Sequence, residues 1–180
     1  MNEKVSRRQF IKKAGLTAAA AIAAPLIVPS TVMGKTPPSD SILVAAIGLG
    51  WQGSSNLNSF LRESDVRVVA LCDIDKEHLN HNLRKVQRKY GDKSCKTYHK
   101  FEELLERKDI DAVSIGLPDH WHSIPAIMAA KNNKDIYGEK PLSHTLTEGR
   151  AMCNTVKRCS RVWQTGSWQR SQSHFRHAAE

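Results

Sequence analysis

The sequence has few cysteines and no long uninterrupted apolar run. Its 180 residues include only four cysteines, too few for the disulfide framework that stabilises small secreted proteins. The longest apolar stretch, residues 14–28, is rich in alanine, contains Pro25 and is followed by Pro29. It is shorter than the roughly 20 residues that span a membrane. With 40% hydrophobic and 25% charged residues, the composition is also unlike that of disordered or fibrous chains, and it predicts one globular domain.

Acidic residues are outnumbered, because 27 Lys and Arg against 18 Asp and Glu give a formal net charge of +9. Such an excess can indicate a nucleic-acid partner, so its distribution matters. Almost half of it, a net +4, belongs to residues 1–34. The densest basic patch elsewhere has no interleaved aromatic residues of the kind that single-strand binders use; it consists of Arg84, Lys85, Arg88 and Lys89. We interpret this patch as a solvated helix face and expect no nucleic-acid partner.

Residues 1–34 have the organisation of an export signal. The paired arginines of Ser6-Arg7-Arg8-Gln9-Phe10-Ile11-Lys12 precede the alanine-rich stretch, and small residues follow it. This pattern resembles the bacterial twin-arginine signal. We expect the twin-arginine export machinery to carry the protein to the periplasm, and removal of the signal to leave no stable membrane span. An uncleaved membrane anchor is the alternative, and residues 35–40 are expected to form a linker.

From residue 41 onward, strand-like and helix-like segments alternate. Residues 42–47 are a continuous apolar run, typical of a strand that is covered on both faces, and residues 66–71 are expected to form a second buried strand. Residues 76–90 instead carry apolar side chains at helical spacing. Further strands are expected at 97–98, 112–117, 135–137 and 162–165, and further helices near 57–61 and at 101–107, 121–131 and 147–158. The alternation predicts an α/β fold, a Rossmann-type doubly wound parallel sheet over residues 41–168.

A glycine-rich segment follows the first expected strand. Gly48-Leu49-Gly50-Trp51-Gln52-Gly53 fits the G-x-G-x-x-G pattern of dinucleotide-binding turns. The first glycine permits a tight turn, the second lets the backbone approach a pyrophosphate, and the third lets the helix pack on the strand. The N-terminus of the following helix offers unpaired N–H groups to the phosphates. The segment, including Trp51 and Gln52, is therefore a candidate cofactor-binding site.

An acidic residue stands where the pattern requires one. Asp73 lies 20 residues after Gly53, at the end of the second expected strand. A carboxylate at this position accepts hydrogen bonds from the adenosine ribose and repels a 2′-phosphate. Because no basic residue follows immediately, the sequence predicts NAD as the cofactor, with NADP less favoured.

Three later segments carry a family resemblance. Glu139-Lys140-Pro141 resembles the E-K-P signature of the Gfo/Idh/MocA oxidoreductases. Leu117-Pro118-Asp119-His120-Trp121-His122 is similar to the proline-containing loop after that family's fourth strand, and residues 164–170 resemble the segment after its last nucleotide-domain strand. The resemblance covers residues 41–180 with the segments in the expected order.

The resemblance implies roles for the matching residues. Lys140 would lie beside the nicotinamide and stabilise a developing alkoxide, and Glu139 would help to position the cofactor ribose. Pro118, His120 and His122 would line the nicotinamide half of the cofactor site. His120 and His122 also suggest a metal, but a zinc site needs three or four ligands, so no metal site is expected.

Family members carry a second α/β domain, which shapes the substrate site and usually supplies the catalytic His or Asp. Residues 169–180 resemble the start of the helix that connects the two domains, so we expect the chain to be a fragment without that C-terminal substrate domain. A homo-oligomer remains possible for the full-length protein, since family assembly commonly uses the sheet of that domain.

The leading functional hypothesis is an exported oxidoreductase that transfers a hydride between tightly bound NAD and a sugar or cyclitol. A periplasm has no evident pool of free NAD, so the cofactor would be carried out already bound. The second hypothesis is an NAD-dependent glycoside hydrolase that uses transient oxidation and elimination. The third is a truncated nucleotide-binding module without catalysis.

Overall fold

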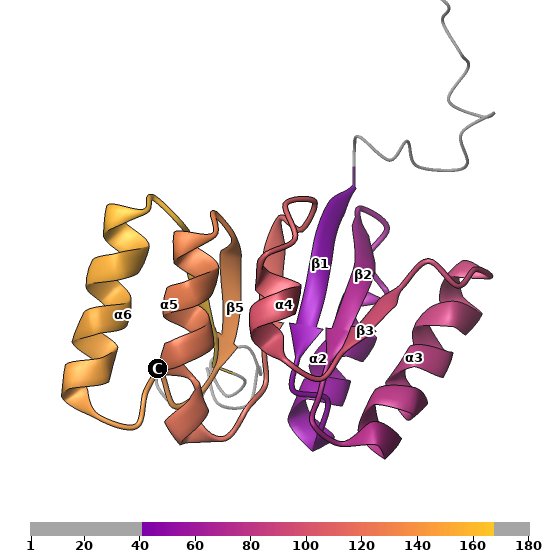
Figure 1. The fold of residues 1–180 in the computed structure, drawn as a ribbon, viewed down its shortest axis with the longest axis horizontal. Coiled ribbons are helices and arrows are strands. Elements are labelled where there is room, and N and C mark those ends of the chain that lie inside the picture. Colours follow the sequence, from indigo (N-terminus) through magenta and orange to yellow (C-terminus); the bar gives the residue numbers. More distant parts are fainter. Residues whose placement is uncertain (1–40, 168–180) are drawn as a thin grey trace, which may run out of the picture. The chain divides into compact units, whose positions relative to one another are not determined.

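A computed structural model describes residues 41–167 and contains one six-stranded parallel sheet (Figure 1). The strands are ordered β3-β2-β1-β4-β5-β6, and every neighbouring pair is parallel. The strand bounds are β1 Ile42–Ile47, β2 Val66–Cys72, β3 Lys96–Tyr98, β4 Ala112–Ile115, β5 Asp135–Glu139 and β6 Trp163–Gly166. The chain enters in the middle at β1, moves outward to β3, returns to β4 and moves outward again to β6. This order confirms the doubly wound Rossmann-type sheet.

Helices cover both faces of the sheet. They are α2 Trp51–Phe60, α3 Lys76–Tyr90, α4 Phe101–Leu105, α5 Ser123–Lys131 and α6 Leu146–Arg158, with a short 3₁₀ helix η3 at Asp119–Trp121. Successive residues of β1 contribute to opposite faces: Ala45 and Ile47 join the apolar cluster under α4, α5 and α6, whereas Ala46 joins the cluster under α2 and α3. This alternation explains why β1 reads as a continuous apolar run.

Local signals determine where several helices begin and end. The Asp75 side chain caps α3 by accepting from the N–H groups of Glu77 and His78, and Gly91 ends the helix with a φ of +71°. Thr145 and Glu148 form a reciprocal capping box at the start of α6. Helix α2 differs, because Gly50 precedes it and provides no side-chain cap. Its first N–H groups are therefore left for another partner.

Some expected boundaries shift. The strand expected at 112–117 ends at Ile115, and the N–H of the next residue, Gly116, donates to the carbonyl of Ile47. The strand expected at 135–137 continues to Glu139, which pairs with Gly166. The helix expected at 121–131 is divided into η3 and α5. The signal at 1–34, the linker at 35–40 and the helix start at 169–180 lie outside the described residues.

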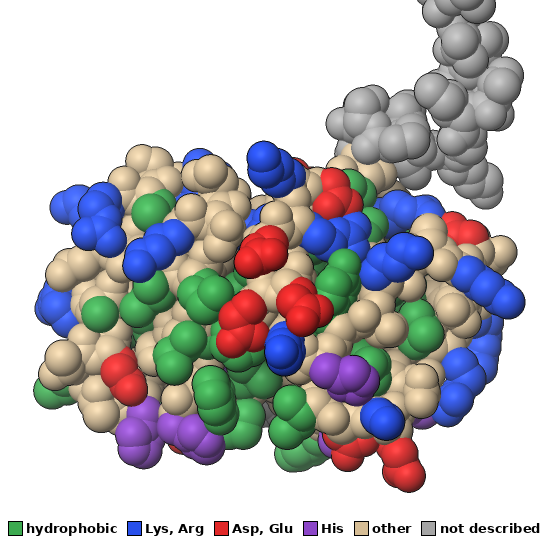
Figure 2. Space-filling view, viewed as in Figure 1, with side chains coloured by type: hydrophobic (Ala, Val, Ile, Leu, Met, Phe, Trp, Pro, Cys, Tyr) green, Lys and Arg blue, Asp and Glu red, His purple; other side chains and the backbone are tan. Residues whose placement is uncertain are grey.

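Charged side chains are spread over the face shown in Figure 2, and Lys and Arg do not form one continuous patch there. The histidine side chains visible on this face lie in its lower half. Among residues 41–167, no helix is long and apolar enough to cross a membrane.

Candidate functional site

Three glycines form a close backbone contact at the carboxyl end of β1. Gly48 has a φ of +82°, and a Cβ built on it would lie 2.4 Å from the Gly116 carbonyl oxygen. A Cβ on Gly53 would lie 1.9 Å from the Gly48 oxygen, and one on Gly116 would lie 2.8 Å from the Gly53 Cα. No side chain fits at these positions, because the atom nearest to each added Cβ belongs to the backbone. The contact holds the start of α2 against the ends of β1 and β4.

Gly50 is glycine for a different reason. Its φ is −62°, which any residue adopts, and the nearest atom to a Cβ built there is the His78 Cε1, 4.0 Å away. Neither the backbone conformation nor the packing of the protein therefore requires a glycine. A Cβ would instead project into open space beside the first turn of α2, where a pyrophosphate would approach. The residues present thus fit the dinucleotide cofactor that the motif predicts.

Asp73 lies at the end of β2, directly beside the glycine turn. Its Oδ2 accepts a hydrogen bond of 2.6 Å from the N–H of Leu49, and its Oδ1 accepts one of 2.8 Å from the N–H of Asp75. The side chain is 9% exposed. Two carboxylate oxygens offer about four acceptor sites, so ribose hydroxyls could still bind. Asp73 thus ties the glycine turn to β2, a contact that the sequence did not predict.

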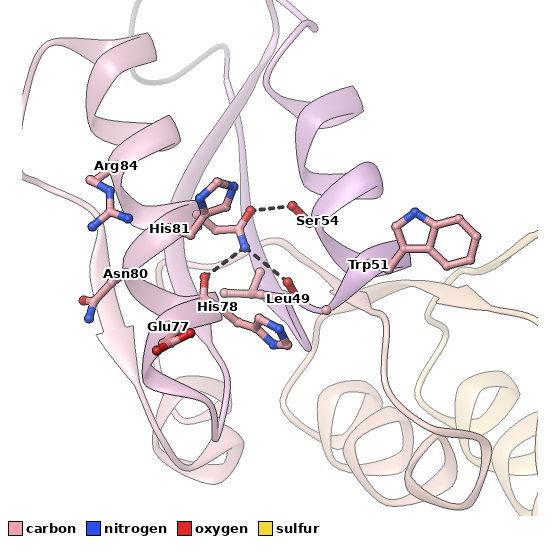
Figure 3. Close-up of a pocket in the computed structure, with 10 residues that line it drawn as sticks. Leu49, Trp51, Ser54, Glu77, His78, Asn80, His81 and Arg84 are labelled. Atoms are coloured by element: carbon pink, nitrogen blue, oxygen red, sulfur yellow. Dashed lines mark hydrogen bonds between the residues drawn. The ribbon is translucent and has the colours of Figure 1, made fainter.

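A cleft of about 740 Å³ opens between the first turns of α2 and α3 (Figure 3). Leu49, Gly50 and Trp51 line one side, and His78 and His81 line the other. His78 Nδ1 lies 3.8 Å from Asp73 Oδ2, and its Cε1 lies 4.0 Å from where a Cβ on Gly50 would be, so this imidazole lies close to both Asp73 and the glycine turn. Trp51 is 92% exposed and extends away from α3 in Figure 3.

Glu139 is buried in the middle of a hydrogen-bonded cluster. Its Oε1 accepts from the Asn56 Nδ2 at 2.9 Å and from the Gln52 Nε2 at 3.4 Å. Both donors come from α2, so the cluster connects the glycine helix to the end of β5. Asn56 was missed by the sequence argument; the signal was its position one helical turn after Gln52. Burial, and secondarily the charge of Glu139, raise the pKa of the nearby Tyr137.

A second cleft, of about 430 Å³, includes this cluster. Trp51, Gln52 and Asn56 line it from α2, and Tyr137 and Glu139 line it from β5. Lys140 follows Glu139 and is exposed, and its bond to Pro141 is cis. The predicted residues Gln52 and Glu139 thus come together in one cleft, whereas Lys140 lies immediately beyond the strand.

The three residues predicted to line the cofactor site from the loop after β4 differ in their exposure to solvent. Pro118 and His120 are exposed, whereas His122 is 1% exposed. The His122 Nδ1 lies 2.7 Å from the carbonyl oxygen of Pro141, and its Nε2 lies 2.8 Å from that of Leu117. Both ring nitrogens therefore contact backbone oxygens of the protein. His122 joins the loop to the E-K-P turn.

The described part of the chain, residues 41–167, contains no group of three His, Cys, Asp or Glu residues arranged to hold a metal ion. Cys72 and Cys95 are buried thiols, and neither Cys153 nor Cys159 is in a disulfide. Burial, and secondarily the charge of Asp73, raise the pKa of Cys72 to about 12.

Curated proteins similar to this chain include glycosyl hydrolase family 109 proteins. A glycosyl hydrolase family 109 protein of Shewanella pealeana is 31% identical over 171 residues, covering 86% of this chain and 38% of the relative. Another, from Solibacter usitatus, is 30% identical, covering 88% and 38%. The chain thus spans about two fifths of the length of these curated relatives.

Solved structures share the fold. Myo-inositol 2-dehydrogenase from Lactobacillus plantarum aligns with a TM-score of 0.66 and 25% identity, covering 77% of this chain and 40% of that one. Scyllo-inositol dehydrogenase from Lactobacillus casei, with bound NAD(H) and scyllo-inositol, aligns with a TM-score of 0.68 and 18% identity, covering 77% and 39%. The second likeness concerns the fold alone.

Residues 42–167 match the model of the oxidoreductase family with an NAD-binding Rossmann fold. The match spans more than half of the sequence and includes the glycine turn, Asp73 and the E-K-P segment. The chain therefore belongs to the Gfo/Idh/MocA oxidoreductases and contains the NAD-binding Rossmann domain of that family.

Proposed function

We propose that the full-length protein is an exported oxidoreductase that transfers a hydride between tightly bound NAD and a CH–OH carbon of a sugar or cyclitol. Gly50 is the observation that carries the cofactor half of this proposal. The protein itself needs no glycine there, yet a side chain would cover the first turn of α2. The N–H groups of that turn lack acceptors within the helix, and the positive end of the helix dipole favours a pyrophosphate.

The other residues at this edge have complementary roles. Asp73 would accept hydrogen bonds from the adenosine ribose, and Glu139, held by Asn56 and Gln52, would bind the ribose next to the nicotinamide. When bound, NAD supplies the redox chemistry by accepting the hydride, which leaves a carbonyl on the substrate carbon. The exposed ammonium group of Lys140 would stabilise negative charge on the reacting oxygen. A base in the substrate domain would take the hydroxyl proton.

The substrate class is supported by the proteins that share this fold. The structural neighbours include a dehydrogenase of myo-inositol, which is a cyclitol. The curated relatives are named as glycosyl hydrolases, whose substrates are carbohydrates. A polyhydroxylated ring is common to both groups, so we propose a ring hydroxyl as the group that is oxidised.

An NAD-dependent glycoside hydrolase is the second candidate, and the names of the curated relatives favour it. In this reaction, removal of a hydride converts a ring hydroxyl to a ketone, which acidifies the adjacent C–H. Loss of that proton expels the glycosidic oxygen with its electron pair. Water then adds at the anomeric carbon, and return of the hydride restores the hydroxyl. The net change is hydrolysis, with no net oxidation.

Export also bears on how the cofactor is held. We propose that the twin-arginine segment directs the folded protein to the periplasm with NAD already bound. An enzyme that retains its cofactor must return the hydride, either to a second substrate or to the same sugar. Full-length protein purified from the periplasm should therefore release about one nucleotide per chain when it is denatured. Protein that releases none would contradict the retained-cofactor proposal.

A pair of variants tests the cofactor site directly. Gly50→Val places a branched side chain beside the first turn of α2 and should abolish nucleotide retention. Asn58→Ala changes an exposed residue of the same helix and should leave retention unchanged. Equal retention by Gly50→Val and the wild type would exclude this turn as the pyrophosphate site. The unfolding midpoints of both variants, measured in urea, establish that each is folded.

Product analysis separates the two candidate reactions. Incubation of the full-length protein with sugars, cyclitols and aryl glycosides should give an oxidised ring if the first candidate is correct. A free aglycone and an unoxidised sugar would instead support the hydrolase. If neither product forms with any of these substrates while NAD remains bound, the proposal of a CH–OH substrate of this class is wrong.

A further inference from the structure

Asn82 is a buried polar side chain of α3 that contacts the glycine turn. It is 1% exposed, and its Nδ2 donates hydrogen bonds to the carbonyl oxygen of Leu49 at 3.2 Å and to that of His78 at 2.9 Å. Its Oδ1 accepts from the Ser54 Oγ at 2.7 Å and from the Lys85 Nζ at 3.2 Å. The dashed lines in Figure 3 mark the bonds to Leu49, His78 and Ser54. Since a side-chain amide has two N–H donors and two acceptor lone pairs, its whole hydrogen-bonding capacity is used.

The bond to Leu49 fixes one peptide group of the glycine turn. The Leu49–Gly50 peptide bond is trans, because the one cis bond within residues 41–167 precedes Pro141. In a planar trans peptide, the C=O and the N–H point in opposite directions. Holding the Leu49 oxygen toward Asn82 therefore directs the Gly50 N–H away from Asn82. Among residues 41–167, no atom accepts a hydrogen bond from this N–H, so it is available to a ligand.

A different residue holds the preceding peptide group. The Leu49 N–H, which belongs to the Gly48–Leu49 peptide, donates to the Asp73 Oδ2 at 2.6 Å. Asp73 and Asn82 thus hold neighbouring but separate peptide groups of the turn. Loss of the Asn82 contact should leave the Asp73 contact in place. A change at Asn82 should therefore affect the binding of phosphates more than the binding of the adenosine ribose.

We infer that Asn82 is a positioning residue that orients the Gly50 N–H toward the pyrophosphate of the cofactor. The inference rests on the proposed function, in which NAD binds at the glycine turn. Without the bond from the Asn82 Nδ2, nothing fixes the Leu49 oxygen, and the Leu49–Gly50 peptide group is free to rotate. Its N–H then donates less well to a phosphate oxygen, and a hydrogen bond to a charged acceptor is weakened.

A comparison of ADP with adenosine tests this role. ADP carries the diphosphate of NAD, whereas adenosine shares the base and ribose but has no phosphate. Asn82→Leu, made in the complete 180-residue chain freed of bound nucleotide, keeps the branched shape of the side chain and removes its polar atoms. Leucine is neutral, whereas an aspartate would itself repel phosphates. The dissociation constant of ADP, measured by titration calorimetry, should increase about tenfold, and that of adenosine, measured by NMR titration, should change less than about twofold.

The ratio of the two dissociation constants is the decisive quantity, because a fraction of unfolded protein raises both equally. Tyr90→Phe is the matched control, since it removes another hydrogen bond of an α3 side chain. The Tyr90 Oη accepts from the N–H of Val68 at 3.0 Å and ties the last residue of α3 to β2. Its ratio should equal that of the wild type. A wild-type ratio in Asn82→Leu, or an equal change in Tyr90→Phe, would overturn the inference.

A second measurement observes the Gly50 N–H itself. In protein labelled with ¹⁵N-glycine, Gly50→Ala identifies the resonance by its absence. In the wild type, ADP should shift the Gly50 amide proton downfield, because a new hydrogen bond to phosphate forms, and adenosine should not. Asn82→Leu should lose most of this shift. If the wild type shows no downfield shift with ADP, the inference is wrong. Should Asn82→Leu not fold, Asn82→Ala, which leaves room for water beside the freed groups, replaces it in both measurements.

The outcomes also separate this inference from the proposed function. If the wild-type chain binds neither NAD nor ADP, the proposed function fails and the inference fails with it. If the wild type binds ADP with the expected Gly50 shift, and the Asn82 variant has the same ratio of dissociation constants and the same shift, only the inference fails.

Discussion

The two halves of the carboxyl edge of the sheet are held together in different ways. In the glycine half, the backbones of Gly48, Gly53 and Gly116 touch, so the geometry depends on the absence of side chains. In the E-K-P half, the geometry depends on side chains, because Glu139 is held by amides of α2 and His122 bridges two loops.

This difference separates two kinds of sensitivity. A backbone contact cannot adjust to an added methyl group, but it is indifferent to pH, since amides do not titrate. A contact made by a carboxylate or an imidazole tolerates small changes in volume, but it depends on charge and on partners far away in the sequence. We therefore expect substitutions in the glycine half to act by steric exclusion, and those in the E-K-P half to act through lost hydrogen bonds.

The largest effect is expected from Gly53→Ala. The added methyl group would lie 1.9 Å from the Gly48 oxygen, and neither backbone can move without separating α2 from β1. We expect the free energy of unfolding to fall by about 3 kcal/mol or more, measured by urea denaturation.

Gly50→Ala is the matched control, because no atom lies closer than 4.0 Å to the added carbon. Its free energy of unfolding should fall by about 1 kcal/mol at most, because alanine is a poorer N-cap residue than glycine but also reduces the entropy of the unfolded chain. Similar destabilisation by both variants would show that the glycine half is not held by the close backbone contact.

Asn56→Ala should have the next largest effect, in the E-K-P half. The variant removes the shorter of the two hydrogen bonds to the buried Glu139 Oε1 and leaves only the 3.4 Å contact to Gln52. The expected loss in the free energy of unfolding is about 2 kcal/mol, because a buried acceptor loses a partner. Asn58→Ala, an exposed change in the same helix, should cost much less, and equal losses would contradict this account of Glu139.

A change of cofactor preference tests Asp73 more finely. Asp73→Ala combined with Ile74→Arg removes the carboxylate and adds a cation at a position that is 89% exposed. The ratio of the dissociation constants of NADP and NAD should fall about tenfold or more. Using this ratio cancels any fraction of unfolded protein. Ile74→Arg alone is the control, and an unchanged ratio in the double variant would show that Asp73 does not select against the 2′-phosphate.

The glycine half could be predicted from the sequence better than the E-K-P half. The order of strands and helices, the glycine turn and the position of Asp73 are local patterns, and the described residues have them where they were expected. Strand β4 is shorter and β5 is longer than the sequence predicted. The end of a strand depends on its pairing with neighbouring strands, such as the pairing of Glu139 with Gly166, and a single segment of sequence does not contain that information. His122 was predicted to line the cofactor site together with His120. Its bridge between two carbonyls could not be predicted, because it requires the β4 and β5 loops to be placed side by side.

The smallest expected effect is on the rate at which the Cys72 thiol, at the end of β2 in the glycine half, is alkylated. Burial, and secondarily Asp73, raise the pKa of Cys72 to about 12, so the reactive thiolate is scarce, whereas Cys153 is exposed on α6. Iodoacetamide at about pH 8 should label Cys153 rapidly and leave Cys72 unlabelled in the native protein, as measured by mass spectrometry of peptides. Raising the pH to about 9 should not change this order, since the Cys72 thiol still remains protonated. Because Cys72 immediately precedes Asp73, its labelling reports whether the end of β2 opens. Labelling of Cys72 as fast as that of Cys153 would mean that the glycine half opens readily, and that its close backbone contacts do not make it rigid.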